Sequence, residues 1–158
     1  MKLTDKEKRR FILGSYFIIA NKLQNYGDLY LKEMNLTTKQ WLLLAVLEKD
    51  FEEIGKYPGI GELANSLGTS HQNVKQIANK LERKGLVKLF KDEEDKRVLR
   101  VKSTKENRSL WEARNDVNDA ELEKTFKNFE DIELDNFMNC LLKFYENVLD
   151  RIEIIKKG

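Results

Sequence analysis

The hydrophobic pattern of this sequence changes its period at Gly85. Before Gly85, apolar residues recur every three or four positions, as they do in helices. After it, the segments 86–91 and 98–102 are rich in residues that favour β-strands, and the polar stretch 92–97 between them has the composition of a turn. The sequence therefore predicts a helix that is followed directly by a β-hairpin with a charged tip.

The segment before Gly85 has the pattern of two helices that meet at a tight turn. We expect a short helix over 60–67 and a longer one over 70–84. Ala64 provides a small side chain where the backbones approach, and Gly68 tolerates a positive φ in the turn. The apolar residues that would lock the second helix onto the first are Leu63, Leu67, Val74, Ile77 and Leu81. Alone, this pattern also suits an ordinary helical hairpin, but the β-hairpin that follows favours a winged helix-turn-helix.

The rest of the chain is predicted to be helical, because it contains few helix breakers and a single proline, Pro58. Capping boxes, in which a Thr is followed three residues later by Glu or Gln, mark helix starts at Thr4 and Thr37. A loop is expected around 55–59. The four further helices are expected over residues 4–33, 37–50, 104–128 and 132–158. The predicted fold class is mainly α, a winged helix-turn-helix with a two-stranded β-wing and long terminal helices.

Apolar stripes run along these outer helices. In the last helix the stripe keeps a strict spacing of four and three, which is typical of the seam of a packed helix pair. Its members are Leu134, Met138, Leu141, Tyr145, Val148, Ile152 and Ile155. The first helix has a similar stripe at Ile12, Tyr16, Ile19, Leu23, Tyr26 and Tyr30. Trp111, Val117 and Leu122 are the expected buried residues of the helix over 104–128.

Positive charge is concentrated around the predicted winged helix. Residues 71–105 contain eleven Lys and Arg against five Asp and Glu, whereas the remaining residues contain 18 basic and 22 acidic ones. A local positive lobe on an otherwise acidic chain is typical of nucleic-acid binding. A solvated charged surface would give the same count, so charge alone leaves both interpretations open.

In a winged helix-turn-helix the second helix enters the major groove of double-stranded DNA, and this assigns roles to its outward side chains. Amide side chains bond bidentately to adenine, and the residues expected to read bases are His71, Gln72, Asn73 and Gln76. The expected backbone contacts are Ser70, Lys75, Lys80, Lys88 and Lys91. At the tip of the wing, Arg97 is expected to enter the minor groove, held in place by Asp95. The alternatives are that the amides only solvate a helix face and that Asp95 and Arg97 form an ordinary surface ion pair.

Taken together, these motifs resemble the MarR family of bacterial transcription regulators. The matching segments are Leu36–Trp41, Glu62–Val74, Leu81–Val87, Asp95-Lys96-Arg97 and Val98–Thr104. The resemblance covers nearly the whole chain, including the terminal helices, and the combination of motifs is specific although each single piece is not. Two positions differ. The family often has Gly where this chain has Asn107, and its redox sensors usually carry a cysteine in the first helix, whereas Cys140 lies in the last.

The resemblance implies a homodimer that binds a pseudo-palindromic operator, with repression and release by a small aromatic effector as the expected mode of action. It divides the chain into dimerisation helices at 1–34 and 130–158, a DNA-binding lobe at 36–104 and a linking helix at 105–129. The implied dimer interface contains Ile12, Tyr16, Ile19, Leu141, Tyr145, Val148 and Ile152. A winged-helix module that contacts only proteins, without specific DNA binding, is the main alternative.

The sequence lacks the residues that other functions would need. Cys140 is the only cysteine, and we expect it to be buried and inert. His71 is the only histidine and has no second ligand nearby, so no metal site and no cofactor are predicted. No nucleophile and base can be paired, which argues against an enzyme, although a catalytic site assembled from scattered residues stays an alternative. The absence of a signal peptide and of a long apolar run predicts a cytoplasmic protein that is not in a membrane.

Overall fold

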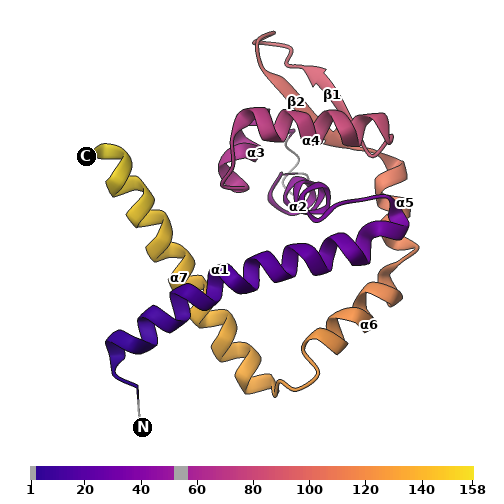
Figure 1. Cartoon of the computed structure of the whole chain (residues 1–158). Coiled ribbons are helices and arrows are strands. Elements are labelled where there is room, and N and C mark those ends of the chain that lie inside the picture. The colour runs from indigo at the N-terminus through magenta and orange to yellow at the C-terminus, as the bar shows by residue number, and fades with distance from the viewer. Residues whose placement is uncertain (1–2, 52–56) are drawn as a thin grey trace. The chain divides into compact units, whose positions relative to one another are not determined.

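The computed structural model describes residues 3–51 and 57–158, so part of the loop expected at 55–59 lies outside the described residues. The chain forms two compact units, residues 1–112 and 113–158. Helices and a single antiparallel hairpin make up the first unit (Figure 1). Its elements are α1 (Asp5–Tyr30), η1 (Leu31–Met34), α2 (Thr38–Val46), η2 (Leu47–Phe51), α3 (Ile60–Ser66), α4 (His71–Arg83), β1 (Val87–Lys91), β2 (Leu99–Ser103) and α5 (Lys105–Glu112). The second unit consists of α6 (Asn115–Thr125) and α7 (Asp131–Lys157). The predicted fold class, mainly α with a two-stranded wing, is confirmed.

Local capping starts the helices where the sequence predicted. The Thr4 hydroxyl accepts a hydrogen bond from the Glu7 amide at 3.3 Å, and the Thr37 hydroxyl accepts one from the Gln40 amide at the same distance. Helix α1 ends at Tyr30 rather than at residue 33. The chain continues as the 3₁₀ turn η1, which Asn35 closes with a left-handed φ of 53°.

Helix α1 is attached to α2 at a glycine. A Cβ atom at Gly27 would lie only 2.4 Å from the Thr38 hydroxyl oxygen, so the two helices meet where the side chain is missing. The same hydroxyl donates to the carbonyl of Gln24 at 2.9 Å, and the Thr38 amide donates to the carboxylate of Asp28 at 2.7 Å. Thr38, the first residue of α2, therefore holds α1 against that helix.

The core of the first unit lies between α2, α3, α4 and the hairpin, with α2 between α1 and α4 (Figure 1). Of the five residues predicted to lock α4 onto α3, all are buried except Leu67, which is half-buried. Val87 and Val101, on the two strands, close this core from the side of the hairpin. The core is thus formed by the apolar residues that the sequence pattern predicted for α3 and α4, together with residues of α2.

Two glycines allow the turns that end α3 and α4. Gly68 has φ +61° and Gly85 has φ +73°, as the sequence predicted for both. Each is followed by a backbone bond that closes the helix end, from Thr69 to the Ala64 carbonyl at 3.0 Å and from Leu86 to the Leu81 carbonyl at 3.0 Å. The second of these turns leads the chain directly into β1.

A test of this geometry is Gly68→Ala. No atom lies within 4 Å of the position that its Cβ would take, so the whole cost comes from the left-handed backbone. We expect the free energy of unfolding to fall by about 1–2 kcal/mol, measured by urea denaturation. Gly14→Ala is the matched control, because Gly14 also has open space but lies inside α1. There alanine is expected to stabilise by about 0.5–1 kcal/mol, and equal effects at the two glycines would contradict the interpretation.

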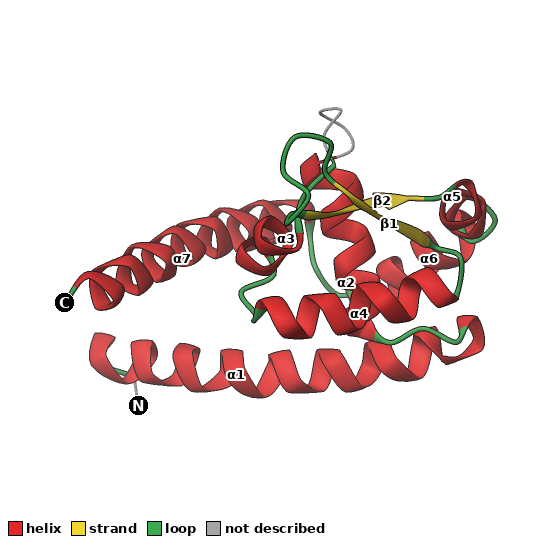
Figure 2. Ribbon diagram, turned by 90° about the horizontal axis from the view of Figure 1, so that it is seen from above, coloured by secondary structure: helices red, strands yellow, loops and turns green. Residues whose placement is uncertain are grey.

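The hairpin pairs Val87 with Ser103, Leu89 with Val101 and Lys91 with Leu99. Figure 2 shows the two strands beside α3 and α4. In this register Val87, Val101 and Ser103 turn toward the core, while Lys88 is exposed. The strands begin and end within one residue of the predicted ranges.

The prediction of one continuous helix over 104–128 is wrong. The structure has two helices, α5 and α6, and the backbone of Arg114 between them leaves the helical region, with φ −119° and ψ 4°. Ala113 and Arg114 are both good helix formers, so no local signal in the sequence marks this break. Two of the predicted buried residues, Val117 and Leu122, are exposed, and Trp111 is only half-buried.

All residues of α6 and α7 are described, and none of them is buried. The predicted burial of Cys140 is therefore wrong for the single chain, in which its thiol is exposed. The physical reason is that two helices alone provide no core. The apolar stripe of α7 is likewise exposed from Met138 onward, and so are Ile12, Tyr16 and Ile19 of α1. Among the described residues, no helix combines the length and the apolarity needed to cross a bilayer.

Candidate nucleic-acid interface

Helix α4 separates its side chains sharply into two faces. Val74, Ile77, Ala78 and Leu81 are buried in the core. The Ser70 hydroxyl caps the helix by accepting from the Asn73 amide at 3.2 Å. The exposed side chains of the opposite face are His71, Gln72, Lys75, Gln76 and Lys80. The start of α4 therefore presents two amides, an imidazole and an ammonium group to the solvent.

Asn73 differs from the other predicted base readers. Its side chain is half-buried, and its Nδ2 donates to the Thr69 hydroxyl at 2.9 Å. The amide thus already has a partner in the turn before α4. Base reading by Asn73 stays a prediction, and its local bond gives it a second role in shaping the start of the helix.

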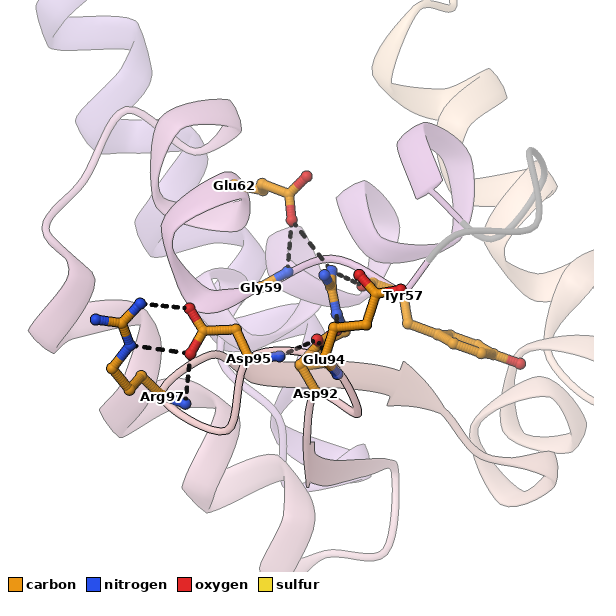
Figure 3. A network of polar contacts seen from close by, with 8 residues as sticks. Tyr57, Gly59, Glu62, Asp92, Glu94, Asp95 and Arg97 are labelled. Atoms are coloured by element: carbon orange, nitrogen blue, oxygen red, sulfur yellow. Dashed lines mark hydrogen bonds and ion pairs between the residues drawn. The ribbon is translucent and has the colours of Figure 1, made fainter.

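At the tip of the wing, Asp95 holds Arg97 through three hydrogen bonds (Figure 3). The Arg97 Nε and Nη2 atoms each donate to the carboxylate at 2.9 Å, and the Arg97 backbone amide donates to it at 3.0 Å. The Arg97 side chain nevertheless remains 91% exposed. Bonding by the Arg97 side chain lowers the pKa of Asp95, and the carboxylate raises the pKa of Arg97. The structure thus shows the contact between Asp95 and Arg97, with the guanidinium presented to the solvent, and the entry of Arg97 into a minor groove stays a prediction.

Arg100 on β2, a residue that the sequence did not single out, ties the wing to α3. Its Nε bonds to the carboxylate of Asp92, and one Nη atom donates to the Tyr57 carbonyl at 2.7 Å. The same Nη lies 3.6 Å from the carboxylate of Glu62, which accepts the Gly59 amide at 2.8 Å. Arg100 and Tyr57 are 43 positions apart, so no local pattern could have indicated this contact.

Asp92 makes the wing sensitive to acid. Its pKa is lowered from 3.8 to about 2, first by the Asp95 backbone amide and then by the Arg100 side chain. Because the folded chain binds this proton less readily than the unfolded chain does, Asp92 stabilises the fold above about pH 4, and this contribution is lost as the pH falls toward 2. We expect the difference in melting temperature between wild type and Asp92→Asn to be largest above pH 4 and to shrink toward pH 2. A difference that stays constant from pH 6 to pH 2.5 would contradict this assignment.

A groove joins the start of α4 to the wing. Its lining comes from α3, α4 and β2 with the preceding loop, and includes His71, Gln72, Lys75, Arg97 and Arg100. The imidazole of His71 lies against Gly61, where a Cβ would be 3.2 Å from its Cε1 atom. The structure therefore brings two predicted base readers and the wing arginine to one groove. Gln76, Lys80, Lys88 and Lys91 are exposed but do not line it.

Further contacts attach the C-terminal end of α4 to the wing and to the start of α2. The Glu82 carboxylate on α4 accepts the Leu89 amide of β1 at 2.8 Å. Lys84 donates to the Asn35 carbonyl and, at 3.1 Å, to the side chain of Gln40. Burial, and secondarily the charge of Lys80, lowers the pKa of Lys84. The C-terminal end of α4 is thus attached both to β1 and to the segment 35–40.

Asn107 lies where the family resemblance led us to expect a glycine, and it is fully buried in a polar network. Its Nδ2 donates to the Glu48 carboxylate at 2.6 Å and to the Ser103 hydroxyl at 3.0 Å. Its Oδ1 accepts from the Trp111 indole at 2.9 Å. The network connects η2, β2 and α5, so the helix that leaves the wing is bonded to the lobe.

The fold and this groove define a winged helix-turn-helix protein. Among the residues that the structure describes, no cluster of three or more His, Cys, Asp or Glu side chains could hold a metal ion. A sequence model of the MarR family matches residues 34–98. Within these residues the winged helix-turn-helix of this chain is similar to that of the MarR family, as its motifs predicted.

Individual relatives agree with this assignment. The transcriptional activatory protein BadR of Rhodopseudomonas palustris is 36% identical over 93 residues, which are 59% of this chain and 52% of that protein. The match thus spans about half the length of that curated relative. The transcriptional regulator BldR of Sulfolobus solfataricus has a TM-score of 0.73 at 23% identity, over 94% of this chain and 99% of that one. MepR of S. aureus, solved as a complex with DNA, has a TM-score of 0.71 at 19% identity, over 92% and 99%. At these identities the two structures support the fold.

Proposed function

We propose that this protein is a transcription regulator that binds double-stranded DNA as a homodimer, with α4 in the major groove and Arg97 in the adjacent minor groove. The observation that carries the proposal is the common groove of His71, Gln72, Lys75 and Arg97. Base edges are read by side chains near the start of a recognition helix, and a narrow minor groove attracts a guanidinium group. The exposed residues Gln76, Lys80, Lys88 and Lys91 extend this surface with one more amide and three more cations.

The second protomer is inferred from the apolar side chains that the single chain leaves exposed. Helix α7 has 27 residues and none of them is buried, although an apolar stripe follows it from Leu134 to Ile155. A helix with an uncovered apolar face gains little stability of its own in water. A second copy that covers the stripes of α1 and α7 would bury Ile12, Tyr16, Ile19, Leu141, Tyr145, Val148 and Ile152. Sedimentation that shows a monomer at micromolar concentration would contradict the dimer.

A two-fold dimer presents two recognition helices, which fit half-sites about one helical turn apart. Selection of bound duplexes from a random pool is therefore expected to return an inverted repeat with that spacing. Binding is expected to weaken steeply and linearly with the logarithm of the salt concentration, because Lys and Arg displace counterions from phosphates. A protein that ignores duplexes at low salt would instead support a winged-helix module for contacts with other proteins.

We further propose that the protein represses transcription and releases its operator when a small aromatic molecule binds. Losing one of two linked DNA contacts forfeits most of the affinity, so a small change in the separation of the recognition helices is enough for release. Calorimetry with a panel of aromatic acids tests the effector, and the absence of both binding and operator release would count against it. Transcription in vitro tests the sign of regulation, which is of interest because BadR is named an activatory protein.

A further inference from the structure

The turn at the tip of the wing is closed by its own hydrogen bonds. The Asp92 amide donates to the Val98 carbonyl at 3.0 Å, and the Val98 amide donates to the Asp95 carbonyl at 2.9 Å. Inside the turn, the Asp92 carboxylate accepts the amides of Glu94 and Asp95 at 3.0 and 2.9 Å. Glu93 and Glu94 are therefore held in the same short turn as Arg97.

The four acidic residues of this turn fall into two kinds. Asp92 is paired with Arg100, and Asp95 is paired with Arg97. Glu93 and Glu94 are exposed, and no described residue forms a hydrogen bond or an ion pair with either carboxylate. Arg100, which lines a groove together with both glutamates, is already bonded to Asp92 and close to Glu62. Glu94 contributes to the raised pKa of Arg100 through its charge, after the larger effect of Asp92, but neither glutamate forms a direct ion pair with a described residue.

The net charge of this turn differs in sign from that of the lobe around it. Residues 91–97 contain three basic and four acidic side chains, whereas the rest of the segment 71–105 contains eight basic and one acidic. The groove of Glu93 and Glu94, with Tyr57 and Phe90, is distinct from the groove that Arg97 shares with α4. The wing thus presents a guanidinium beside α4 and, in the neighbouring groove, two carboxylates without a direct ion pair.

Resting on the proposed DNA binding, we propose that Glu93 and Glu94 oppose Arg97 and weaken the docking of the wing on every duplex alike. A minor groove about 6 Å wide has phosphates on both sides of an inserted arginine. Residues three and four positions from Arg97 in a closed turn lie within about one Debye length, roughly 8 Å at physiological salt, of those phosphates. The repulsion does not depend on base sequence, so the two glutamates set the absolute affinity and its salt dependence, while α4 sets the choice of sequence.

The test compares wild type with the variant Glu93→Gln/Glu94→Gln, which removes both charges and preserves side-chain shape. Fluorescence anisotropy is measured on a selected operator and on a scrambled duplex, at several salt concentrations. We expect affinity to rise about three- to tenfold on both duplexes at low salt, and the slope of log affinity against log salt to become steeper by about one or two. The control is Glu33→Gln/Glu112→Gln, which changes the net charge equally at exposed positions on η1 and α5, away from both grooves.

The outcomes separate the two proposals. If wild type binds the duplexes but the Glu93→Gln/Glu94→Gln variant binds no more tightly, or gains no more than the control, the role of these glutamates is refuted and the DNA-binding function stands. If wild type binds no duplex even at low salt, the DNA-binding function fails and this inference fails with it. A gain confined to the operator would also overturn the inference, because repulsion from phosphates acts on both duplexes.

Discussion

Replacing Asn107 with leucine is expected to lower the free energy of unfolding by about 2–4 kcal/mol, measured by urea denaturation at a fixed protein concentration. Leucine has nearly the same size but cannot bond. The Glu48 carboxylate and the Trp111 indole would both lose a partner that now lies at 2.6 and 2.9 Å. Removing one hydrogen-bond partner from groups that are partly withdrawn from water costs more than an average hydrogen bond contributes, and the cost is largest for a charged group.

A graded series makes this prediction specific. Glu48→Gln keeps an oxygen that accepts from Asn107, so we expect a change of less than about 1 kcal/mol. Trp111→Phe removes one bond and little volume, so an intermediate loss of about 1–2 kcal/mol is expected. If Asn107→Leu were as stable as wild type, the network would contribute nothing beyond packing, and the attachment of α5 to the lobe would need another cause.

The double variant Gln72→Ala/Gln76→Ala is expected to bind its operator at least about a hundredfold more weakly, while its affinity for a scrambled duplex changes by less than about threefold. Each bidentate contact between an amide and adenine contributes about 1–3 kcal/mol of discrimination, and the proposed dimer makes each contact twice. Both side chains are exposed on one face of α4, one helical turn apart, so their removal leaves the core intact.

Lys75→Ala is the matched comparison, since Lys75 lies between the two glutamines on the same helix. Its loss is expected to weaken operator and scrambled duplexes equally and to reduce the salt slope by about one per protomer. Titrations on both duplexes measure these effects. Equal losses on both duplexes for the glutamine variant would mean that Gln72 and Gln76 contribute to affinity without reading bases.

Features that depend on neighbouring residues were predictable from the sequence. Capping by Thr4 and Thr37 follows from residue types three positions apart. The left-handed turns at Gly68 and Gly85 follow from the residue type that tolerates them best. The wing follows from a change of hydrophobic period, and the Asp95–Arg97 pair is formed within three consecutive residues.

Errors arose where burial and helix continuity depend on more than local pattern. Cys140, Val117 and Leu122 have the spacing of buried residues, yet the single chain offers them no core. The break at 113–114 interrupts a run of good helix formers. An apolar stripe tells which face of a helix needs a partner, but it does not tell whether that partner is in the same chain.

The sequence by itself determined most of the elements of this protein, the residues that face outward from α4 and the family that its winged helix resembles, because period, capping and turn chemistry act over a few residues. Only the tertiary structure decided that Arg100 would bind Asp92 and Tyr57, that Asn107 would join Glu48 to Trp111, and that Arg97 and Gln72 would line one groove. Two of these contacts, Arg100 with Tyr57 and Asn107 with Glu48, join residues more than forty positions apart. Such contacts come from the packing of whole helices and strands, and no local pattern of the chain encodes them.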